Sequence, residues 1–153
     1  MGLDMYLYAK KYFWGSEWTE KAKIEMDMFF KAHGTDVVGD VKYIACEAVY
    51  WRKANAIHKW FVENVQQGED DCEEYDVSID QLRELLRVCK KALEERNLSE
   101  RPLGLETTEG FFFGGTGYDD WFWEGVQYTV DKLTVLLKRK DLDKWDFVYR
   151  SSW

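Results

Sequence analysis

The sequence predicts an α+β fold, with an antiparallel or mixed sheet and helices packed on one side of it. Segments with strand-like alternation fall between segments with helical periodicity, in the order strand, weak helix, strand, helix, strand, helix, loop, helix, strand. The chain has 153 residues, which suits one hydrophobic core. No internal repeat or linker interrupts it, so residues 1–153 are expected to form a single compact domain.

Aromatic residues make up 17% of the chain, more than a core of this size needs. Some of these rings fill the core, and others are expected to line a stacking pocket or an interface, because aromatic side chains carry large area with few rotors. The hydrophobic content of 46% and charged content of 33% are typical of a globular chain.

The net charge of −8 argues against DNA binding, because no basic run is longer than Lys138 to Lys140. Cys46, Cys72 and Cys89 are widely spaced and odd in number, so neither a disulfide framework nor a zinc site is expected, and a reducing cytoplasm is. No signal peptide is visible, and no apolar stretch approaches the roughly 20 residues that span a bilayer, so no membrane association is expected.

Gly2 to Tyr8 alternates apolar and polar residues and predicts a half-buried strand. Ser16 to Ala32 predicts a helix with Ser16 as its N-cap. Its apolar stripe is weak, so the helix is expected to be an edge element or an insertion. Alternatively, Met28 and Phe29 form an exposed patch used in self-association, which would make the protein a homo-oligomer.

Val41 to Tyr50 predicts a second strand, in which Glu47 is expected to face solvent. The alternative is an inward Glu47 that pairs with Arg52 or Lys53.

Arg52 to Val65 then predicts a helix that buries Ile57, Phe61 and Val65. The helical spacing also places Arg52, Asn55 and Lys59 together on a second, polar face of this helix. His58 lies at the border of that face, and Trp51 directly precedes the helix. Free N–H groups at a helix start and the fork of an arginine favour an anion or a planar polar ligand. The alternative is that Arg52 and Lys53 are only solvated and that Asn55 forms hydrogen bonds with the backbone.

Gln67 to Glu74 is a polar loop. Asp70 and Asp71 are candidate partners of His58, as metal ligands or as a catalytic pair, but calcium-loop spacing is missing. We therefore expect an acidic turn that holds Arg52 or His58, with no metal and no cofactor.

Tyr75 to Val77 predicts a short strand, and Ser78 begins the strongest helix of the chain, with Gln81 in capping-box spacing. Cys89 lies on the apolar face of this helix and is expected to be a core thiol. Asn97 to Thr108, with Pro102, predicts a connecting loop.

Gly110 to Gly117 has three phenylalanines between glycines, which suits a short segment laid over the core. The loop lacks the Walker lysine and the dinucleotide glycine pattern. The turn after it adds candidate ligand-binding residues, whose carboxylates suit a ribose hydroxyl or a base amino group: Thr116, Tyr118, Asp119, Asp120 and Trp121.

Trp121 to Arg139 predicts the last helix, and Lys144 to Tyr149 a closing strand. Trp153 either packs over the sheet or is an exposed anchor.

Four segments resemble a family of small, mostly uncharacterised proteins of tailed phages and prophages: MGLDMYLY, VYWRKANAIHKWFVENVQ, GEDDC and GFFFGGTGYDD. The resemblance is weakest over Asp36 to Asp40 and the helix before it. It implies a phage origin and action in the cytoplasm of a bacterial host. It lends no activity and no catalytic residue.

Three functions fit the sequence. The first is a binding protein that captures a nucleotide-like ligand, such as a host immune signal, in counter-defence. The second is a small hydrolase that uses His58 with Asp70 or Asp71. The third is an inhibitor whose aromatic and acidic surface docks on a host protein. We favour the first, with a ligand held between the residues around Arg52 and the turn after Gly117.

Overall fold

The computed structural model describes residues 2–96, 101–111 and 113–153, and it contains a four-stranded sheet in the order β2-β1-β4-β3. The strands are β1 (Asp4–Tyr12), β2 (Tyr43–Arg52), β3 (Tyr75–Val77) and β4 (Asp146–Ser152). Every neighbouring pair is antiparallel. The α+β class is confirmed, and the sheet is antiparallel rather than mixed.

Alternation along β1 decides which face of the sheet is buried. Leu3, Met5 and Leu7 are fully buried, whereas Tyr6 and Tyr8 point to the other face. β1 runs longer than the expected strand and continues to Tyr12. The register with β2 shifts after Leu7, where a bulge bends the hairpin.

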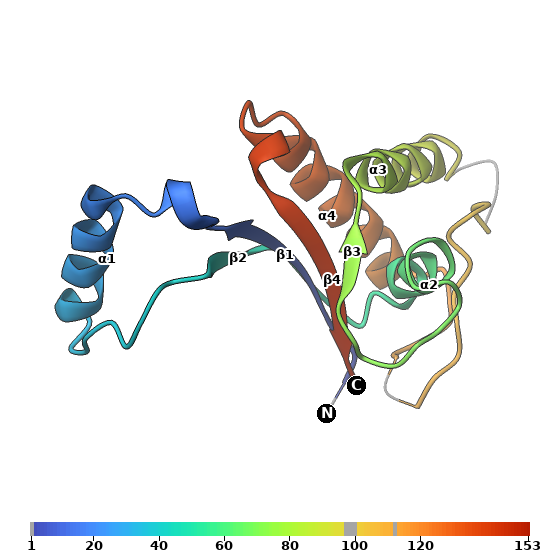
Figure 1. The fold of residues 1–153 in the computed structure, drawn as a ribbon. Coiled ribbons are helices and arrows are strands. Elements are labelled where there is room, and N and C mark those ends of the chain that lie inside the picture. Colours follow the sequence, from blue (N-terminus) through green and yellow to red (C-terminus); the bar gives the residue numbers. More distant parts are fainter. Residues whose placement is uncertain (1, 97–100, 112) are drawn as a thin grey trace.

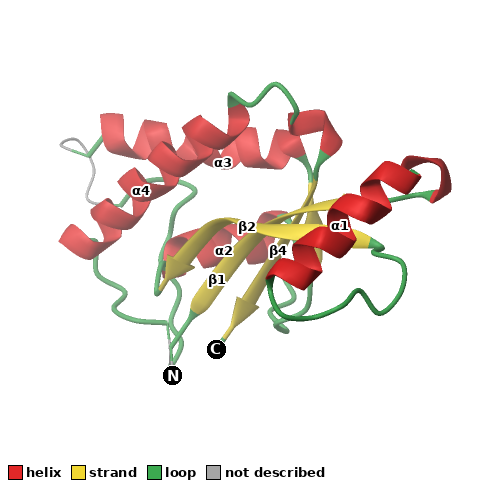
Figure 2. Cartoon of the chain, turned by 90° about the vertical axis from the view of Figure 1, so that its left-hand side faces the viewer, coloured by secondary structure: helices red, strands yellow, loops and turns green. Residues whose placement is uncertain are grey.

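Three helices lie together on the buried face of the sheet: α2 (Asn55–Asn64), α3 (Ile79–Glu94) and α4 (Asp120–Leu137) (Figure 1). Helix α1 (Glu20–Ala32) stands apart at the far end of the β1–β2 hairpin, on the opposite side of the sheet (Figures 1 and 2). The weak stripe of α1 is explained by this position, because none of its residues is buried.

The expected start of α1 at Ser16 is wrong by several residues. Ser16 belongs to a short 3-10 turn, η1 (Gly15–Glu17), and Thr19 is the N-cap. The Thr19 hydroxyl accepts a hydrogen bond of 3.2 Å from the Ala22 N–H, which satisfies one of the free donors at the helix start.

The core fills the space between the sheet and the three helices. Its largest fully buried apolar side chains are contributed by the central strands, by α2, α3 and α4, and by the loop before α4: Leu3, Met5, Leu7, Ile57, Phe61, Leu82, Leu85, Leu105, Leu133 and Tyr149. The capping box of α3 is confirmed, since the Ser78 hydroxyl accepts from the Gln81 N–H and the Gln81 side chain accepts from the Ser78 N–H. Cys89 is fully buried, as expected.

The loop from α3 to α4 is described only in part. Residues 97–100 of the expected connecting loop and Phe112 of the three-phenylalanine run lie outside the described residues. Phe113 is buried against the ring of His58, which confirms that part of this segment covers the core. A second 3-10 turn, η2 (Leu142–Lys144), leads from α4 into β4.

Candidate functional site

A hollow of about 950 Å³ lies where β2 passes into α2, facing the first two turns of α4. Its size falls within the roughly 300–1,000 Å³ typical of small-molecule sites. Five of the predicted ligand-binding residues line it: Trp51, Arg52, Asn55, Asp119 and Trp121. The segment after Tyr50 and the turn after Gly117 therefore meet at one cavity.

Two cations stand on one side of this hollow. The Arg52 side chain is 63% exposed, and its Nε lies 4.0 Å from an Asp4 oxygen that also accepts a short hydrogen bond from Tyr50. Such a loose, exposed ion pair contributes little, so the rest of the guanidinium is available to a ligand. Within the described parts of the chain, no carboxylate lies at ion-pair distance from the Lys53 ammonium.

The backbone at Lys53 connects β2 to α2 through an unusual conformation. Lys53 has φ of 55°, in the left-handed region that non-glycine residues rarely adopt, and its N–H donates to the Leu3 carbonyl. The Lys53 side chain packs against Gly114, which has φ of 86°. A Cβ added at Gly114 would lie 3.3 Å from the Cβ of Lys53. The two left-handed residues together bring the glycine loop to the edge of the hollow.

The start of α2 opens into the hollow without a side-chain cap. Ala54 occupies the N-cap position, and no side chain of the described residues accepts from the N–H groups of the first turn. Asn55 instead donates its amide N–H groups to Gly115 O at 2.7 Å and Phe113 O at 3.4 Å. The asparagine therefore holds the glycine loop, as its backbone-bonding alternative predicts, and residues 54–57 at the start of α2 line the cavity.

The start of α4 contributes acidic and aromatic side chains to the hollow. Asp119 caps α4 by accepting a hydrogen bond from the Phe122 N–H at 3.1 Å, and no donor among the described residues bonds its second oxygen. Glu124 lines the hollow one turn later. Trp121 is 82% exposed, and its ring has no aromatic partner among the described residues. Tyr128 completes this side.

The floor of the hollow is rigid. The Trp51 indole N–H donates to Thr129 Oγ1 at 2.9 Å, and the same hydroxyl donates to Gly125 O at 2.8 Å. Trp51 is 2% exposed and meets the Phe61 ring edge to face. Because Trp51 is buried and held by these two contacts, it supports the cavity rather than reaching into it.

Comparison with protein-family models, with curated proteins and with solved structures gives no match to the chain.

Among the described residues, no group of three or more His, Cys, Asp and Glu side chains is close enough to hold a metal ion. No helix of this part of the chain is both long and apolar enough to cross a bilayer.

The structure does not bring Lys59, His58 and Asp120 into the hollow. The expected common face of Arg52, Asn55 and Lys59 is wrong, because Arg52 belongs to β2 and the helix begins only at Asn55. Lys59 points along α2 toward Glu63, at 3.6 Å. Asp120 lies 3.5 Å from Arg96, outside the cavity.

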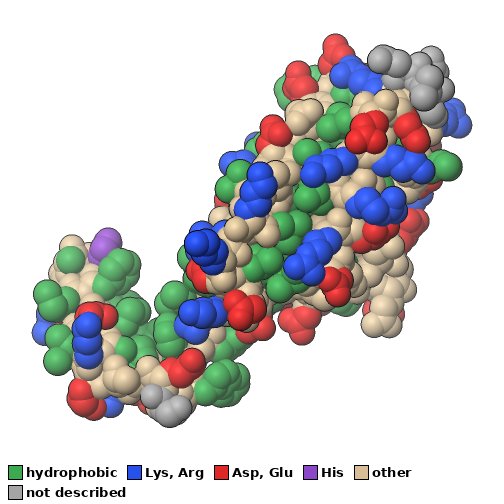
Figure 3. Space-filling model, turned by 90° about the horizontal axis from the view of Figure 1, so that it is seen from above, with side chains coloured by type: hydrophobic (Ala, Val, Ile, Leu, Met, Phe, Trp, Pro, Cys, Tyr) green, Lys and Arg blue, Asp and Glu red, His purple; other side chains and the backbone are tan. Residues whose placement is uncertain are grey.

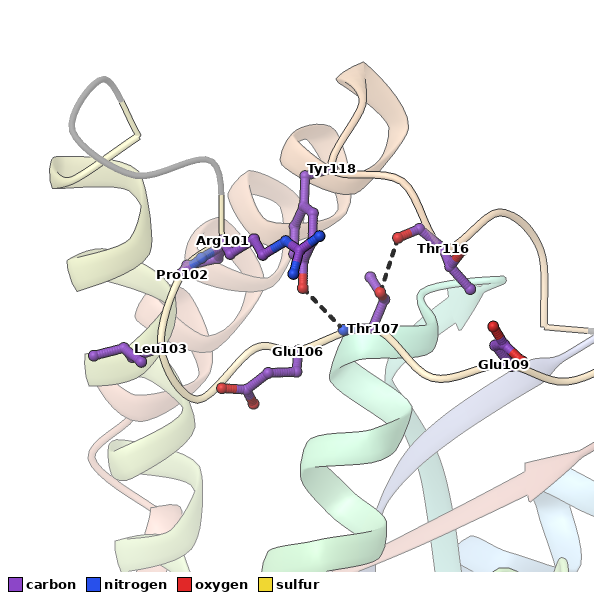
Figure 4. A pocket seen from close by; sticks show the side chains of 8 residues that line it. All are labelled: Arg101, Pro102, Leu103, Glu106, Thr107, Glu109, Thr116 and Tyr118. Carbon is purple, nitrogen blue, oxygen red and sulfur yellow. Dashed lines mark hydrogen bonds between the residues drawn. The ribbon is translucent and has the colours of Figure 1, made fainter.

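Thr116 and Tyr118 line a second, smaller hollow of about 540 Å³ (Figure 4). There the Thr107 hydroxyl donates to Thr116 O at 2.8 Å, and the Thr107 N–H donates to the Tyr118 hydroxyl at 3.4 Å. Both contacts are internal to the loop before α4. They shape this loop, and Thr107 lies at the border of the two hollows.

His58 is fully buried, and both of its ring nitrogens are engaged. Nδ1 lies 2.7 Å from the Tyr149 hydroxyl, and Nε2 lies 2.9 Å from Asp70 Oδ2. The expectation that an acidic turn holds His58 is confirmed. Phe113 covers the imidazole, so no substrate hydroxyl or water reaches it in this structure, and the hydrolase alternative lacks an accessible base.

Asp71 is not part of that network. It accepts from the Tyr75 hydroxyl and from the Glu73 N–H, and the hydrogen bond from the Glu73 N–H lowers the pKa of its carboxyl. Trp153 donates its indole N–H to Asp70 at 3.0 Å and packs edge-on against Phe113. The chain end is thus packed over the core, although 45% of Trp153 is exposed.

Sequence reasoning missed Lys53, Glu124 and Tyr128 as lining residues. A helical signal for two of them was present, since Trp121, Glu124 and Tyr128 are spaced by three and four residues and share a face of α4. For Lys53 no local signal exists, because its place depends on the turn between β2 and α2.

Proposed function

We propose that this chain is a binding protein that captures a small, polar, nucleotide-like ligand in the hollow between the β2–α2 junction and the start of α4. The observation that supports this is the composition of the cavity. Two cations and a helix start without a side-chain cap line the same hollow as two carboxylates, Asp119 and Glu124, and an exposed tryptophan. These groups match the anionic, hydroxyl-bearing and planar parts of a nucleotide.

The anionic part of the ligand binds at the start of α2. Free N–H groups and the helix dipole favour a phosphate there, and Arg52 and Lys53 add charge-assisted hydrogen bonds from the same side. The overall charge of −8 makes this local arrangement necessary, because the rest of the surface repels an anion.

The planar part stacks on Trp121, and the hydroxyl or amino groups bind Asp119 and Glu124. A base on an aromatic ring contributes about 1–3 kcal/mol. The two carboxylates accept hydrogen bonds and do not donate them, so they select hydroxyl and amino groups over a second phosphate.

The resemblance to phage proteins suggests a biological role for such binding. A phage protein that holds a nucleotide without consuming it, in the cytoplasm of its host, removes a host immune signal from its receptor. The inaccessible imidazole of His58 favours capture over hydrolysis.

The test is a thermal-shift screen of the full chain with mononucleotides, dinucleotides and cyclic dinucleotides. A ligand present at 100 times its Kd raises the free energy of unfolding by about 2.7 kcal/mol. The best ligand is then titrated by calorimetry and recovered by chromatography. Recovery of intact ligand after prolonged incubation supports capture, and a hydrolysed product contradicts it.

Three variants locate the site. Arg52→Ala and Lys53→Ala are expected to weaken binding, and Trp121→Ala to reduce it by about 1–3 kcal/mol. The matched control is Arg83→Ala, since Arg83 is similarly exposed on α3 and does not line the hollow. Equal affinity in all four variants contradicts a site in this hollow.

A further inference from the structure

The second hollow, of about 540 Å³, lies beside the first and shares a wall with it. Thr107 lines both hollows. In the stretch that enters α4, Gly117 and Asp119 line the first hollow, whereas Thr116 and Tyr118 line the second. Neighbouring residues of this stretch therefore belong to different hollows, and a single stretch of chain separates the two cavities.

Two stretches of the loop before α4 form the second hollow (Figure 4). One carries Glu106 and Thr107, and the other carries Thr116 and Tyr118. The Tyr118 side chain points from the second stretch toward the first, where its hydroxyl accepts from the Thr107 N–H at 3.4 Å. The Tyr118 ring also meets the ring of Phe122 edge to face at 4.9 Å, and Phe122 lines the first hollow. The tyrosine is thus a fixed aromatic wall between two cavities.

The second hollow suits a neutral group that donates hydrogen bonds. Two carboxylates, Glu106 and Glu109, and one cation, Arg101, line it. The Gly104 N–H donates to Glu106 at 3.0 Å, and this bond lowers the pKa of the Glu106 carboxyl, which is therefore ionised at neutral pH. An ionised carboxylate accepts from hydroxyl and amino groups and repels a phosphate. A nucleoside, with its planar base and its sugar hydroxyls, fits beside Tyr118 better than a second anion does.

The border between the two hollows lies close to the start of α2. Asn55, the first residue of α2, donates to Gly115 O at 2.7 Å. The Thr107 hydroxyl donates to the carbonyl of the next residue, Thr116, at 2.8 Å. An anionic group at the start of α2 is therefore near the passage to the second hollow. Along this path a place for an anion lies between two places for rings and hydroxyl groups.

Surface charge favours a short ligand. A single strand of nucleic acid follows a positively charged groove along its backbone. Figure 3 shows that, on the described part of the face seen from above, basic side chains lie among acidic ones. On α3, for example, Arg83 pairs with Asp80 and Arg87 with Glu84. With a net charge of −8, the chain is suited to a ligand held within the hollows rather than to a long strand.

We propose that the ligand is a dinucleotide that occupies both hollows, an inference that rests on the function proposed above. One nucleoside stacks on Trp121 in the first hollow, and the second lies against Tyr118 in the second hollow. The phosphate that joins them lies between the start of α2 and Thr107. A mononucleotide occupies only the first hollow and leaves the second one unused.

The experiment compares two ligands that carry the same singly charged phosphodiester. Calorimetry titrates the full chain with the methyl ester of AMP and with ApA, in which one phosphate joins two adenosines; the guanine pair is treated in the same way. A stacked base contributes a factor of about 5 to 150 in affinity. The dinucleotide is therefore expected to bind more tightly than the methyl ester by a factor in this range.

Variants of the second hollow are expected to remove this difference. Thr116→Trp fills the hollow and Tyr118→Leu removes its ring, so each should lower the affinity for the dinucleotide to that of the methyl ester and leave the methyl ester unaffected. Trp121→Ala, in the first hollow, should weaken both ligands. The matched control is Tyr12→Leu, because Tyr12 is half-buried like Tyr118 but lines neither hollow, and it should change neither affinity. Circular dichroism checks that each variant is folded.

Three results overturn the proposal. Equal affinity of the wild-type chain for the dinucleotide and the methyl ester leaves the first hollow as a mononucleotide site and contradicts only the dinucleotide. A preference for the dinucleotide that survives in folded Thr116→Trp and Tyr118→Leu places the second nucleoside outside the second hollow. Binding of none of the four ligands contradicts the proposed function itself, and the dinucleotide with it.

Discussion

The hydroxyl of Tyr149 lies 2.7 Å from Nδ1 of His58, and both side chains are fully buried. Burial raises the pKa of Tyr149, so its hydroxyl stays protonated at neutral pH. That hydroxyl shares a hydrogen bond with Nδ1, and Nε2 of the same ring shares one with Asp70 at 2.9 Å. This chain of contacts joins β4, α2 and the loop before β3, and Trp153 extends it to the last residue.

Removing the Tyr149 hydroxyl tests the structural role of this network. Tyr149→Phe keeps the ring stacked on Phe61 but leaves Nδ1 of His58 without its hydrogen-bond partner. A buried polar atom that loses its partner costs about 1–3 kcal/mol, so the free energy of unfolding is expected to fall by that amount in denaturant titration. The control is Tyr75→Phe, since the Tyr75 hydroxyl bonds Asp71 at the surface and its loss is expected to leave stability nearly unchanged. Equal stability of Tyr149→Phe and wild type contradicts the network.

The three thiols are expected to react at different rates. Cys46 is exposed, Cys72 is half-buried and Cys89 is fully buried. Burial raises the pKa of the Cys89 thiol to about 12, so little thiolate forms at neutral pH. Titration of the native chain with a disulfide reagent is expected to modify Cys46 first and Cys89 only after unfolding. Rapid modification of all three in the folded chain contradicts this assignment.

Alkaline pH is expected to destabilise the fold through Cys89. The folded pKa of about 12 lies above the ordinary thiol value of 9.0, so the folded state resists losing this proton and the unfolded state does not. The stability is fully present below pH 9.0 and is lost progressively as pH rises toward about 12. Cys89→Ala is the control, because the free energy of unfolding of this variant is expected to fall less steeply as the pH rises above 9.0. An unchanged slope in that variant contradicts the linkage.

Two glycines beside the hollow are expected to respond oppositely to alanine. Gly125 lies inside α4, and an added Cβ meets Ala54 at 4.0 Å, an ordinary contact, so Gly125→Ala should stabilise the helix by about 1 kcal/mol. Gly114 has φ of 86°, and an added Cβ lies 3.3 Å from Lys53, so Gly114→Ala should destabilise by about 1 kcal/mol or more. Gly115→Ala, at ordinary φ with open space around it, is the control for the loop. Thermal unfolding measures all three.

The backbone conformation of Lys53 is expected to lower the stability of the fold while it places a cation in the hollow. Its φ of 55° costs a side-chain-bearing residue about 1–2 kcal/mol, which glycine avoids while losing some chain entropy. Lys53→Gly should therefore raise the free energy of unfolding by about 0.5–1 kcal/mol and remove a cation from the hollow. A stabilised variant with weakened ligand binding supports a binding role. A destabilised variant shows instead that the aliphatic stem of Lys53 holds the glycine loop.

Local patterns in the sequence predicted most of the elements. The capping pair of Ser78 and Gln81 marks the start of α3, and the alternation after Gly2 marks β1, because both signals depend on neighbours along the chain. The predicted start of α1 was wrong, because Ser16 and Thr19 are both acceptable N-caps and only the tertiary structure determines which of them begins the helix. The expected Arg52, Asn55 and Lys59 face failed for a related reason: helical spacing was applied across a strand end.

By itself, the sequence determined the α+β class, the buried stripe of α2 and the burial of Cys89, because apolar side chains at fixed spacing must leave water on one face. Only the tertiary structure decided that Arg52 and Trp121 share a hollow while His58 is closed off beneath Phe113. It also decided that α1 leaves the body. These outcomes depend on the left-handed turn at Lys53 and on the direction of the hairpin, and such long-range placement has no signature in the neighbouring residues.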